Sequence, residues 1–249
     1  MAALNGGKNT SLLSTRGLSK SFGGLKAVQG VDFDLPAGEI RAVIGPNGAG
    51  KTTFVSLVSG RIAPSAGRIL FDGADITDMP AHRRVAAGIA YTFQITSIYK
   101  TLSVAENVAL AAQRSASGEP ALRAAVGEAL GRVGLSARSA EIAGNLAYGH
   151  QRLLEVAMGL ALKPRLLILD EPTQGLSDAE IEAFVTLVRD IAANATIMLI
   201  EHNMAVVMAL AGRITVMDQG RVIAEGPPEA IRADPKVQAA YLGAPSDAH

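Results

Sequence analysis

A glycine-rich run directly after an apolar stretch constrains this chain more than any other feature. Residues 45–52 read G-P-N-G-A-G-K-T, between the apolar run 40–44 and a helical pattern over 52–58. Glycines let successive backbone N–H groups curl around an anion, and the start of the following helix adds its positive dipole end. The spacing therefore predicts a strand, a phosphate-binding loop and a helix, in that order.

Two side chains in this run carry chemistry. Lys51 can reach the β- and γ-phosphates of a nucleotide, and the hydroxyl of Thr52 can ligate Mg²⁺. The residues that we expect to contact nucleotide here are Gly45, Pro46, Asn47, Gly48, Ala49, Gly50, Lys51, Thr52 and Thr53. The alternative is a glycine-rich hairpin that contains Lys-Thr by chance, and the strand and helix patterns on either side count against it.

A second apolar run ends in two acids. Residues 166–169 are followed by Asp170 and Glu171. In a parallel sheet the carboxyl ends of the strands line the ligand crevice, so both acids should face the phosphate loop. We expect Asp170 to hold Mg²⁺ through water, and Glu171 to orient or deprotonate a water that attacks the γ-phosphate. By itself the segment could equally be a polar turn that closes a strand.

Composition excludes several other classes of protein. The sequence contains no cysteine, which rules out disulfides, zinc–thiolate sites, iron–sulfur clusters and a cysteine nucleophile. Acidic and basic residues balance at 23 each, so no electrostatic feature indicates binding to nucleic acid. The longest clean apolar run, residues 204–211, is far shorter than the roughly 20 residues that a bilayer requires. Any membrane role should therefore come through a partner.

The order of patterns along the chain predicts an α/β fold. Strand-like runs with glycine-rich turns fill residues 12–93, alanine-rich helical patterns fill 104–162, and strands and helices alternate again from 166 onwards. The last part contains strands at 166–169 and 196–200, a helix at 178–193 and a late hairpin at 214–224. We expect a P-loop NTPase core with a mostly parallel sheet, an N-terminal antiparallel β region and an inserted α-helical subdomain.

The motifs that follow the phosphate loop carry a family resemblance. Phe93-Gln94 comes 43 residues after Lys51, and Leu-Ala-Tyr-Gly-His-Gln opens a helical stretch at residue 146. Gly-Leu-Ser-Asp follows at 175–178, and Ile-Glu-His ends a strand at 200–202. In this order the chain resembles the ATP-binding subunits of ABC transporters over residues 12–243. The expected boundaries are a flexible tail at 1–11, one ATPase domain at 12–243 (core 12–94 and 163–243, helical subdomain 95–162) and a tail at 244–249.

The resemblance implies roles for individual residues. Phe22 matches the aromatic residue that stacks on adenine, and Gln94 matches a glutamine that contacts Mg²⁺ and the attacking water. His202 matches a histidine that contacts the γ-phosphate. Residues 175–178 match a loop that runs between two ATP sites in a head-to-tail dimer. Each has a plainer alternative: Phe22 could be ordinary β-core, Gln94 a surface strand end, and His202 the cap of a helix that begins at Asn203.

The segment at 146–151 departs from the family pattern. Leu146, Ala147, Tyr148 and Gly149 match positions that reach ATP bound by the opposite subunit, where the usual sequence is Leu-Ser-Gly-Gly-Gln. Ala147 lacks the serine hydroxyl that normally donates to the γ-phosphate, and such a bond to a charged group contributes about 1.5–3 kcal/mol. Gly149 and the helix start retain backbone N–H groups. We therefore expect a weakened but working site, which suits a heterodimer with two unequal sites.

The run Gly-Ile-Ala-Tyr-Thr-Phe-Gln at 88–94 is similar to that of branched-chain amino-acid importers, with Tyr91 in place of their arginine. The C-terminal segment is similar to the same group. This likeness implies ATP and Mg²⁺ as ligands, a second ABC ATPase subunit (identical or different), two transmembrane permease subunits and, indirectly, a periplasmic substrate-binding protein. The implied location is the cytoplasmic face of the inner or plasma membrane. Lipopolysaccharide-export and urea-uptake ATPases, a soluble P-loop ATPase and a P-loop phosphotransferase are the alternatives.

A permease helix is expected to dock in a groove between Gln94 and residues 95–110. The apolar members of this segment are Ile95, Ile98, Leu102 and Val104. They could instead pack the interior of the helical subdomain, and the sequence alone favours neither interpretation.

Overall fold

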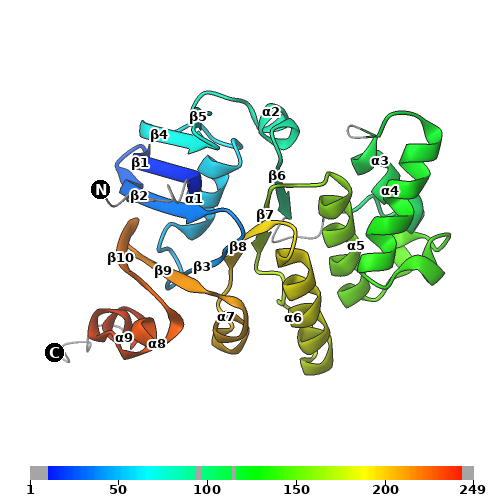
Figure 1. Cartoon of the computed structure of the whole chain (residues 1–249). Coiled ribbons are helices and arrows are strands. Elements are labelled where there is room, and N and C mark those ends of the chain that lie inside the picture. Colours follow the sequence, from blue (N-terminus) through cyan, green and yellow to red (C-terminus); the bar gives the residue numbers. More distant parts are fainter. Residues whose placement is uncertain (1–10, 93–96, 114–115, 243–249) are drawn as a thin grey trace, which may run out of the picture.

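The structure of the protein, a computed structural model, describes residues 11–92, 97–113 and 116–242. Its strands form two sheets, and a group of helices lies at one end of the larger sheet (Figure 1). The smaller sheet is antiparallel, in the order β2 (Leu25–Pro36), β1 (Ser11–Phe22), β4 (Ala66–Phe71), β5 (Ala74–Asp75). The larger sheet has the order β10 (Arg221–Gly226), β9 (Arg213–Asp218), β3 (Ile40–Ile44), β8 (Thr196–Ile200), β7 (Leu166–Asp170), β6 (Ile89–Thr92). Only the β9–β10 pairing in it is antiparallel.

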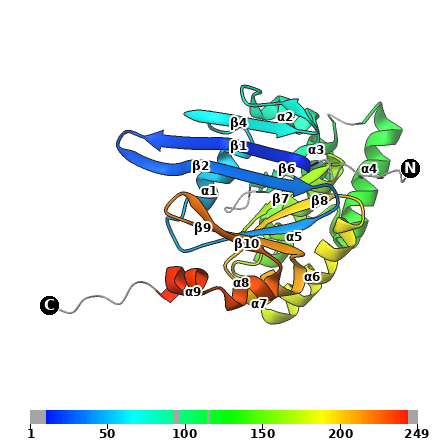
Figure 2. The ribbon, with the colours of Figure 1, turned by 60° about the vertical axis from the view of Figure 1, so that its left-hand side comes forward.

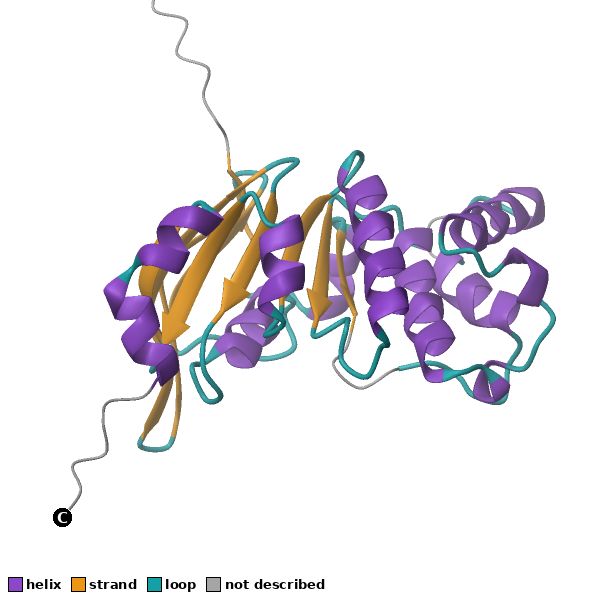
Figure 3. Ribbon diagram, turned by 90° about the horizontal axis from the view of Figure 1, so that it is seen from below, coloured by secondary structure: helices purple, strands orange, loops and turns teal. Residues whose placement is uncertain are grey.

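The helices divide into a group that covers the sheets and a group that projects beyond one end of the large sheet. The first group is α1 (Lys51–Val58), α2 (Ala81–Ala86), α6 (Asp178–Ala192), α7 (Met204–Leu210), α8 (Pro228–Ala233) and α9 (Pro235–Leu242). The second is α3 (Val104–Ala112), α4 (Glu119–Arg132) and α5 (Tyr148–Ala161), with short 3₁₀ turns η1 (Ser136–Arg138) and η2 (Ala143–Asn145). Of this second group, α5 also packs against the large sheet. Figure 3 shows this second group projecting from the end of the large sheet near β6.

The central strands are buried on both faces because each face meets a different layer. All five residues of β7 and all five of β8 are buried. Leu166 and Ile168 pack with α1 and the antiparallel sheet, whereas Leu167 and Leu169 pack with α5 and α6. Continuous apolar runs are typical of parallel strands covered by structure on both sides. The buried carboxyl ends of β7 and β8 lead directly into the acidic residues Asp170, Glu171 and Glu201.

The predicted fold class is confirmed, with differences in the first 90 residues. The first part of this region, expected to be short strands and turns, is one long hairpin, because β1 and β2 have 12 residues each. Gly17 has φ +59° and lies where the β1–β2 register shifts, so it forms a bulge within a strand rather than a turn. Ser11, assigned to the tail, already belongs to β1, and the short helix α2 was not predicted.

The later elements agree closely with the predicted ones. The helix expected at 178–193 is α6, the strands expected at 166–169 and 196–200 are β7 and β8, and the late hairpin is β9–β10. Figure 2 shows the long β1–β2 hairpin lying over the β9–β10 side of the large sheet, with α8 and α9 on the opposite side. In the described part of the chain, every helix is too short or too polar to cross a bilayer.

Part of the segment expected to receive a permease helix packs inside the helical group, Leu102 is half-buried, and the docking of a permease helix stays a prediction. Val104 is fully buried and Ile98 packs against the same apolar cluster. Asn107, also fully buried, donates to the carbonyl oxygens of Tyr99 and Ser103 and so fixes the loop before α3. Ile95 and Gln94 lie outside the described residues.

Candidate active site

The site forms where three neighbouring parallel strands end. β3, β8 and β7 lie side by side in that order, and the chain leaves each of them on the same edge of the sheet. The phosphate loop follows β3, Asp170 and Glu171 close β7, and His202 follows β8. The N–H of Glu171 donates to the carbonyl of Ile200 at 2.8 Å, which ties the ends of β7 and β8 together. The topology therefore brings together three motifs that are far apart in sequence.

Glycine is required at both ends of the phosphate loop. A Cβ atom on Gly45 would collide with the carbonyl oxygen of Met217, and one on Gly50 would collide with that of Ala27. Gly50 also has φ +97°, which side-chain-bearing residues rarely adopt, and it begins helix α1. The β9–β10 turn braces the loop from outside, because the N–H of Gly220 donates to the carbonyl of Ala49 at 2.9 Å.

Lys51 lies inside the loop as a buried cation. Its Nζ donates to the carbonyl oxygens of Gly45 at 2.7 Å and Pro46 at 3.0 Å. Burial lowers the pKa of Lys51, and the nearby negative charges of Glu171 and Asp170 act in the opposite direction. A bound polyphosphate would add negative charge here and raise that pKa again, so the loop is suited to an anionic ligand.

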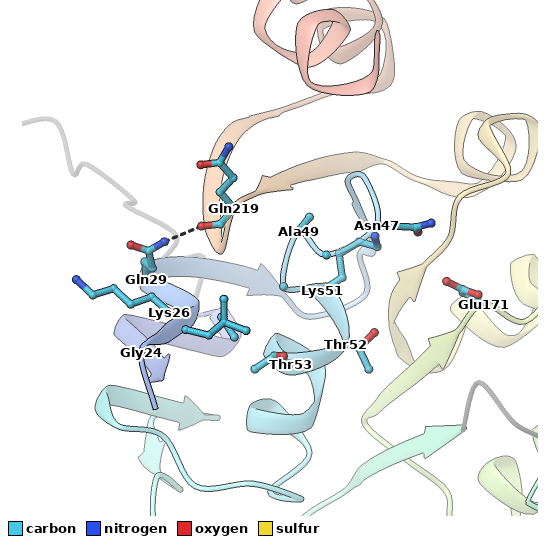
Figure 4. Close-up of a pocket in the computed structure, with 14 residues that line it drawn as sticks. Gly24, Lys26, Gln29, Asn47, Ala49, Lys51, Thr52, Thr53, Glu171 and Gln219 are labelled. Carbon is cyan, nitrogen blue, oxygen red and sulfur yellow. Dashed lines mark hydrogen bonds between the residues drawn. The ribbon is translucent and has the colours of Figure 1, made fainter. Parts of the chain in front are cut away.

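A cavity of about 780 Å³ opens beside the loop. Its lining comes from four parts of the chain: Gly24, Leu25, Lys26, Ala27, Gln29, Asn47, Gly48, Ala49, Gly50, Lys51, Thr52, Thr53, Glu171 and Gln219. In the view of Figure 4, Thr52 and Glu171 lie on one side of Lys51, with Lys26 and Gln29 on the other. The volume is within the range of small-molecule and cofactor sites, roughly 300–1,000 Å³.

Asp170 is almost completely buried, with 1% of its surface exposed. Its Oδ2 accepts a hydrogen bond from the hydroxyl of Tyr91 at 2.7 Å. Burial raises the pKa of Asp170, while the Tyr91 hydrogen bond and the charge of Lys51 act to lower it. Burial and the bond to Asp170 also raise the pKa of Tyr91, so the phenol remains the donor.

The residues present fit an Mg²⁺ ion that is bound mainly by nucleotide phosphates and water, not one that is bound entirely by protein side chains. The described segments hold no group of three or more His, Cys, Asp or Glu side chains that could bind a metal. Mg²⁺ commonly uses one or two protein oxygens together with phosphates and waters. Asp170 with the Thr52 hydroxyl would supply that number.

Glu171 has a constrained backbone. Its φ of +46° lies in the left-handed region, which is unusual for a residue other than glycine. Its carbonyl accepts from Nη2 of Arg152 at 3.3 Å, and the buried Arg152 also bonds Glu155 at 3.1 Å. Helix α5 thus contacts the acid directly, which links the 146–151 segment to the end of β7.

The residues after β8 are organised by Glu201. This acid is 1% exposed and accepts from the backbone N–H groups of His202 at 2.8 Å and Asn203 at 3.0 Å. It also accepts from the N–H and the hydroxyl of Thr173, two residues after Glu171. The side chain of His202 is 60% exposed. Asn203, not His202, caps α7 by accepting from the N–H groups of Ala205 and Val206.

The 146–151 segment packs against the loop at 175–178. A Cβ on Gly175 would lie 2.9 Å from the Tyr148 ring, and one on Gly149 would collide with the Glu180 carboxylate. Glu180 and Ser177 form a capping box at the start of α6. Ala147 is the N-cap of α5 and provides no side-chain hydrogen bond. Leu146 is buried, whereas Ala147 and Tyr148 are exposed.

Not every predicted site residue lines the cavity. Among the described residues, those absent from the lining are Phe22, Gly45, Pro46, Leu146, Ala147, Tyr148, Gly149, Asp170 and His202. Phe22 is 50% exposed at the end of β1, with the Lys20 ammonium 5.2 Å from its ring centroid, and it is absent from the cavity lining. Gly24 and Leu25 of the same hairpin turn do line it. Gln94 lies outside the described residues. The stacking role of Phe22 and the roles of Gln94 remain predictions.

Sequence reasoning missed several residues that the fold brings to the site. Lys26, Gln29 and Gln219 line the cavity, and the Gln29 amide donates to the carbonyl of Gln219 at 2.7 Å. Tyr91 bonds the predicted metal ligand Asp170, and Glu201 bonds the backbone of His202. Glu201 had a usable signal, because it is an acid that ends an apolar strand next to His202.

Comparison with known proteins agrees with this geometry. A family model described as "ABC transporter" matches residues 28–174, from β2 to beyond Glu171. The chain belongs to the ABC transporter family. A second model, "Branched-chain amino acid ATP-binding cassette transporter", matches residues 221–247 of this ABC protein. The family resemblance predicted from the motifs is therefore confirmed.

Similar ABC proteins span nearly the whole chain. The high-affinity branched-chain amino acid transport ATP-binding protein BraF of Pseudomonas aeruginosa is 38% identical over 93% of this chain and 98% of its own length. The protein of the same description, LivG, of Escherichia coli K12 is 39% identical with the same coverage. Among solved structures, the ADP conformation of MJ1267, an ATP-binding cassette of an ABC transporter, has a TM-score of 0.87 and 28% identity. It covers 94% of this chain and 100% of that one.

Proposed function

We propose that this chain is the ATP-binding and ATP-hydrolysing subunit of an ABC importer for branched-chain or related hydrophobic amino acids. The observation that carries the ATPase function is the meeting of Lys51, Thr52 and Glu171 on one cavity beside the phosphate loop. The substrate class is supported by the names of the relatives and by the model that matches residues 221–247.

Each residue of the site has a part in the proposed reaction. The loop amides and Lys51 bind the phosphates, and Thr52 with Asp170 would hold Mg²⁺, whose charge would offset that of the phosphates. Glu171 orients or deprotonates the attacking water, and His202 contacts the γ-phosphate. Gln94 would complete the metal and water contacts, and Phe22 would approach the adenine from the hairpin turn. Hydrolysis with water as acceptor is the expected outcome.

The assembly follows from the same proposal. A second ABC ATPase subunit, identical or different, would complete two ATP sites by contributing its equivalent of Leu146, Ala147, Tyr148 and Gly149. Two permease subunits would hold the pair at the cytoplasmic face of the membrane, and a periplasmic binding protein would deliver substrate. We also propose one ATPase domain at 12–243, with core segments 12–94 and 163–243 around a helical subdomain at 95–162.

The deciding experiment measures orthophosphate release from ATP by the purified chain, alone and with its permease subunits. Release to water that the permeases stimulate would support the proposal. Transfer of the phosphoryl group to another acceptor would identify a phosphotransferase instead. Uptake of labelled leucine into vesicles that contain the assembled transporter would test the substrate class separately.

Lys51→Ala is expected to weaken ATP binding. Loss of a hydrogen bond to a charged group costs about 1.5–3 kcal/mol, which corresponds to roughly 10–150-fold in affinity. Titration with a fluorescent ATP analogue measures this effect. Lys236→Ala removes an exposed lysine outside the cavity lining and serves as the control. Equal affinity of the Lys51 variant and the parent would contradict the assigned phosphate site.

Ala147→Ser is expected to act at two levels. In the isolated chain a serine at the N-cap of α5 should add about 1 kcal/mol of stability and roughly 2–4 °C in Tm. In the assembled dimer the same hydroxyl should strengthen ATP binding at the site that this segment completes. Thermal unfolding and ATP titration of the complex measure the two effects. Unchanged ATP affinity and turnover would show that the missing hydroxyl does not weaken that site.

A further inference from the structure

Tyr91 contacts residues from two elements of the site, Asp170 of β7 and Arg61 just after α1. The proposed reaction gives Tyr91 no role. Its strand, β6, pairs in parallel with β7, and Tyr91 lies opposite Ile168, two residues before Asp170. The side chain is long enough to reach along the strand, and its hydroxyl donates to Oδ2 of Asp170 at 2.7 Å. Because both residues belong to a buried parallel sheet, this contact is held by strand pairing rather than by a loop.

The same hydroxyl is held from its other side. Nη1 of Arg61, just beyond the end of α1, donates to the Tyr91 hydroxyl at 3.5 Å, and the guanidinium lies 5.5 Å from the ring centroid. The phenol therefore accepts from Arg61 and donates to Asp170. This arrangement connects the end of the phosphate-loop helix, through Tyr91, to the acid assigned to Mg²⁺.

A phenol at this position acts on Asp170 differently from a charged side chain. A guanidinium beside Asp170 would offset the carboxylate charge directly, whereas a phenol donates one hydrogen bond and leaves the carboxylate charge in place. The bond occupies Oδ2 and fixes the rotation of the carboxylate. The second oxygen, Oδ1, is then available in a defined orientation.

We propose that Tyr91 is a positioning residue for the divalent cation, holding the Asp170 carboxylate in the orientation that binds Mg²⁺. This inference rests on the proposed function of the site. Groups that hydrogen-bond metal-ligating carboxylates typically change metal affinity by about 10–100-fold when removed. The effect should appear in the Mg²⁺ dependence of nucleotide binding, not in the affinity of the loop for phosphate.

The test compares Tyr91→Phe with the parent by titrating Mg²⁺ at fixed concentrations of a fluorescent ATP analogue. The variant should need about 10–100-fold more Mg²⁺ for half-maximal Mg²⁺-dependent binding. Its affinity for the analogue in EDTA should stay within about twofold, since the phosphate loop is unchanged. Tyr99→Phe removes a phenol hydroxyl from the loop before α3 and should match the parent in both measurements.

The outcomes separate the inference from the proposed function. If Tyr91→Phe and the parent have the same Mg²⁺ dependence, Tyr91 does not position the metal ligand and the inference is wrong. If the affinity in EDTA falls as much as the affinity in Mg²⁺, Tyr91 supports the fold of the site in general, which also overturns it. If the parent itself binds no nucleotide, the proposed function fails.

Discussion

Glu171→Gln is expected to reduce ATP hydrolysis by about 10²–10⁴-fold, the usual contribution of a positioned general base. Glutamine has nearly the same shape, but it cannot accept the proton of the attacking water. The backbone at this position is held by bonds to Ile200 and Arg152, so the variant should keep the parent conformation. ATP binding should survive, because Lys51 and the loop amides are unchanged.

The measurement is single-turnover hydrolysis at saturating ATP, with binding measured separately. Glu182→Gln, on the exposed face of α6, is the matched control and should keep parental rates. A variant that loses binding together with hydrolysis would indicate that Glu171 has a structural role. Hydrolysis that persists within a few-fold of the parent would assign the base to another residue.

The parts of the site that sequence predicts well are those with a local signature. The phosphate loop needs glycine at positions where a Cβ would collide, and Asp170 ends an apolar run that must be buried. Both requirements are visible in a short window of residues. For the same reason β7, β8 and α6 were predicted almost residue by residue.

The contacts that sequence could not predict depend on strand order. The bond from Tyr91 to Asp170 exists because β6 pairs with β7, although 79 positions separate the two residues. The contact of Gly220 with the loop likewise needs β9 next to β3. No local pattern specifies those neighbours. The prediction of a turn near Gly17 was wrong for a related reason. Glycine is favoured both in turns and in β-bulges, so its presence does not distinguish a turn from the bulge that the structure has there.

The second large effect is a loss of stability, expected when Glu201 is replaced. This buried acid accepts hydrogen bonds from the loop after β7 and from the loop after β8. Glu201→Ala removes a buried acceptor from three backbone N–H groups, those of Thr173, His202 and Asn203. A buried donor left without its partner costs about 1–3 kcal/mol. Since the loops can rearrange to satisfy part of this loss, we expect the free energy of unfolding to fall by about 3 kcal/mol and Tm by roughly 6–12 °C.

Denaturant unfolding measures this loss, with Glu229→Ala on the exposed face of α8 as the control. A decrease below about 1 kcal/mol would contradict the structural role of Glu201, because a typical single hydrogen bond already contributes that much. Hydrolysis gives a second readout. Glu201 holds the backbone of His202 against the loop that follows Glu171, so the variant should lose kcat by a larger factor than it raises KM for ATP. If KM rose while kcat stayed constant, the network would serve nucleotide binding rather than the alignment of the γ-phosphate contacts.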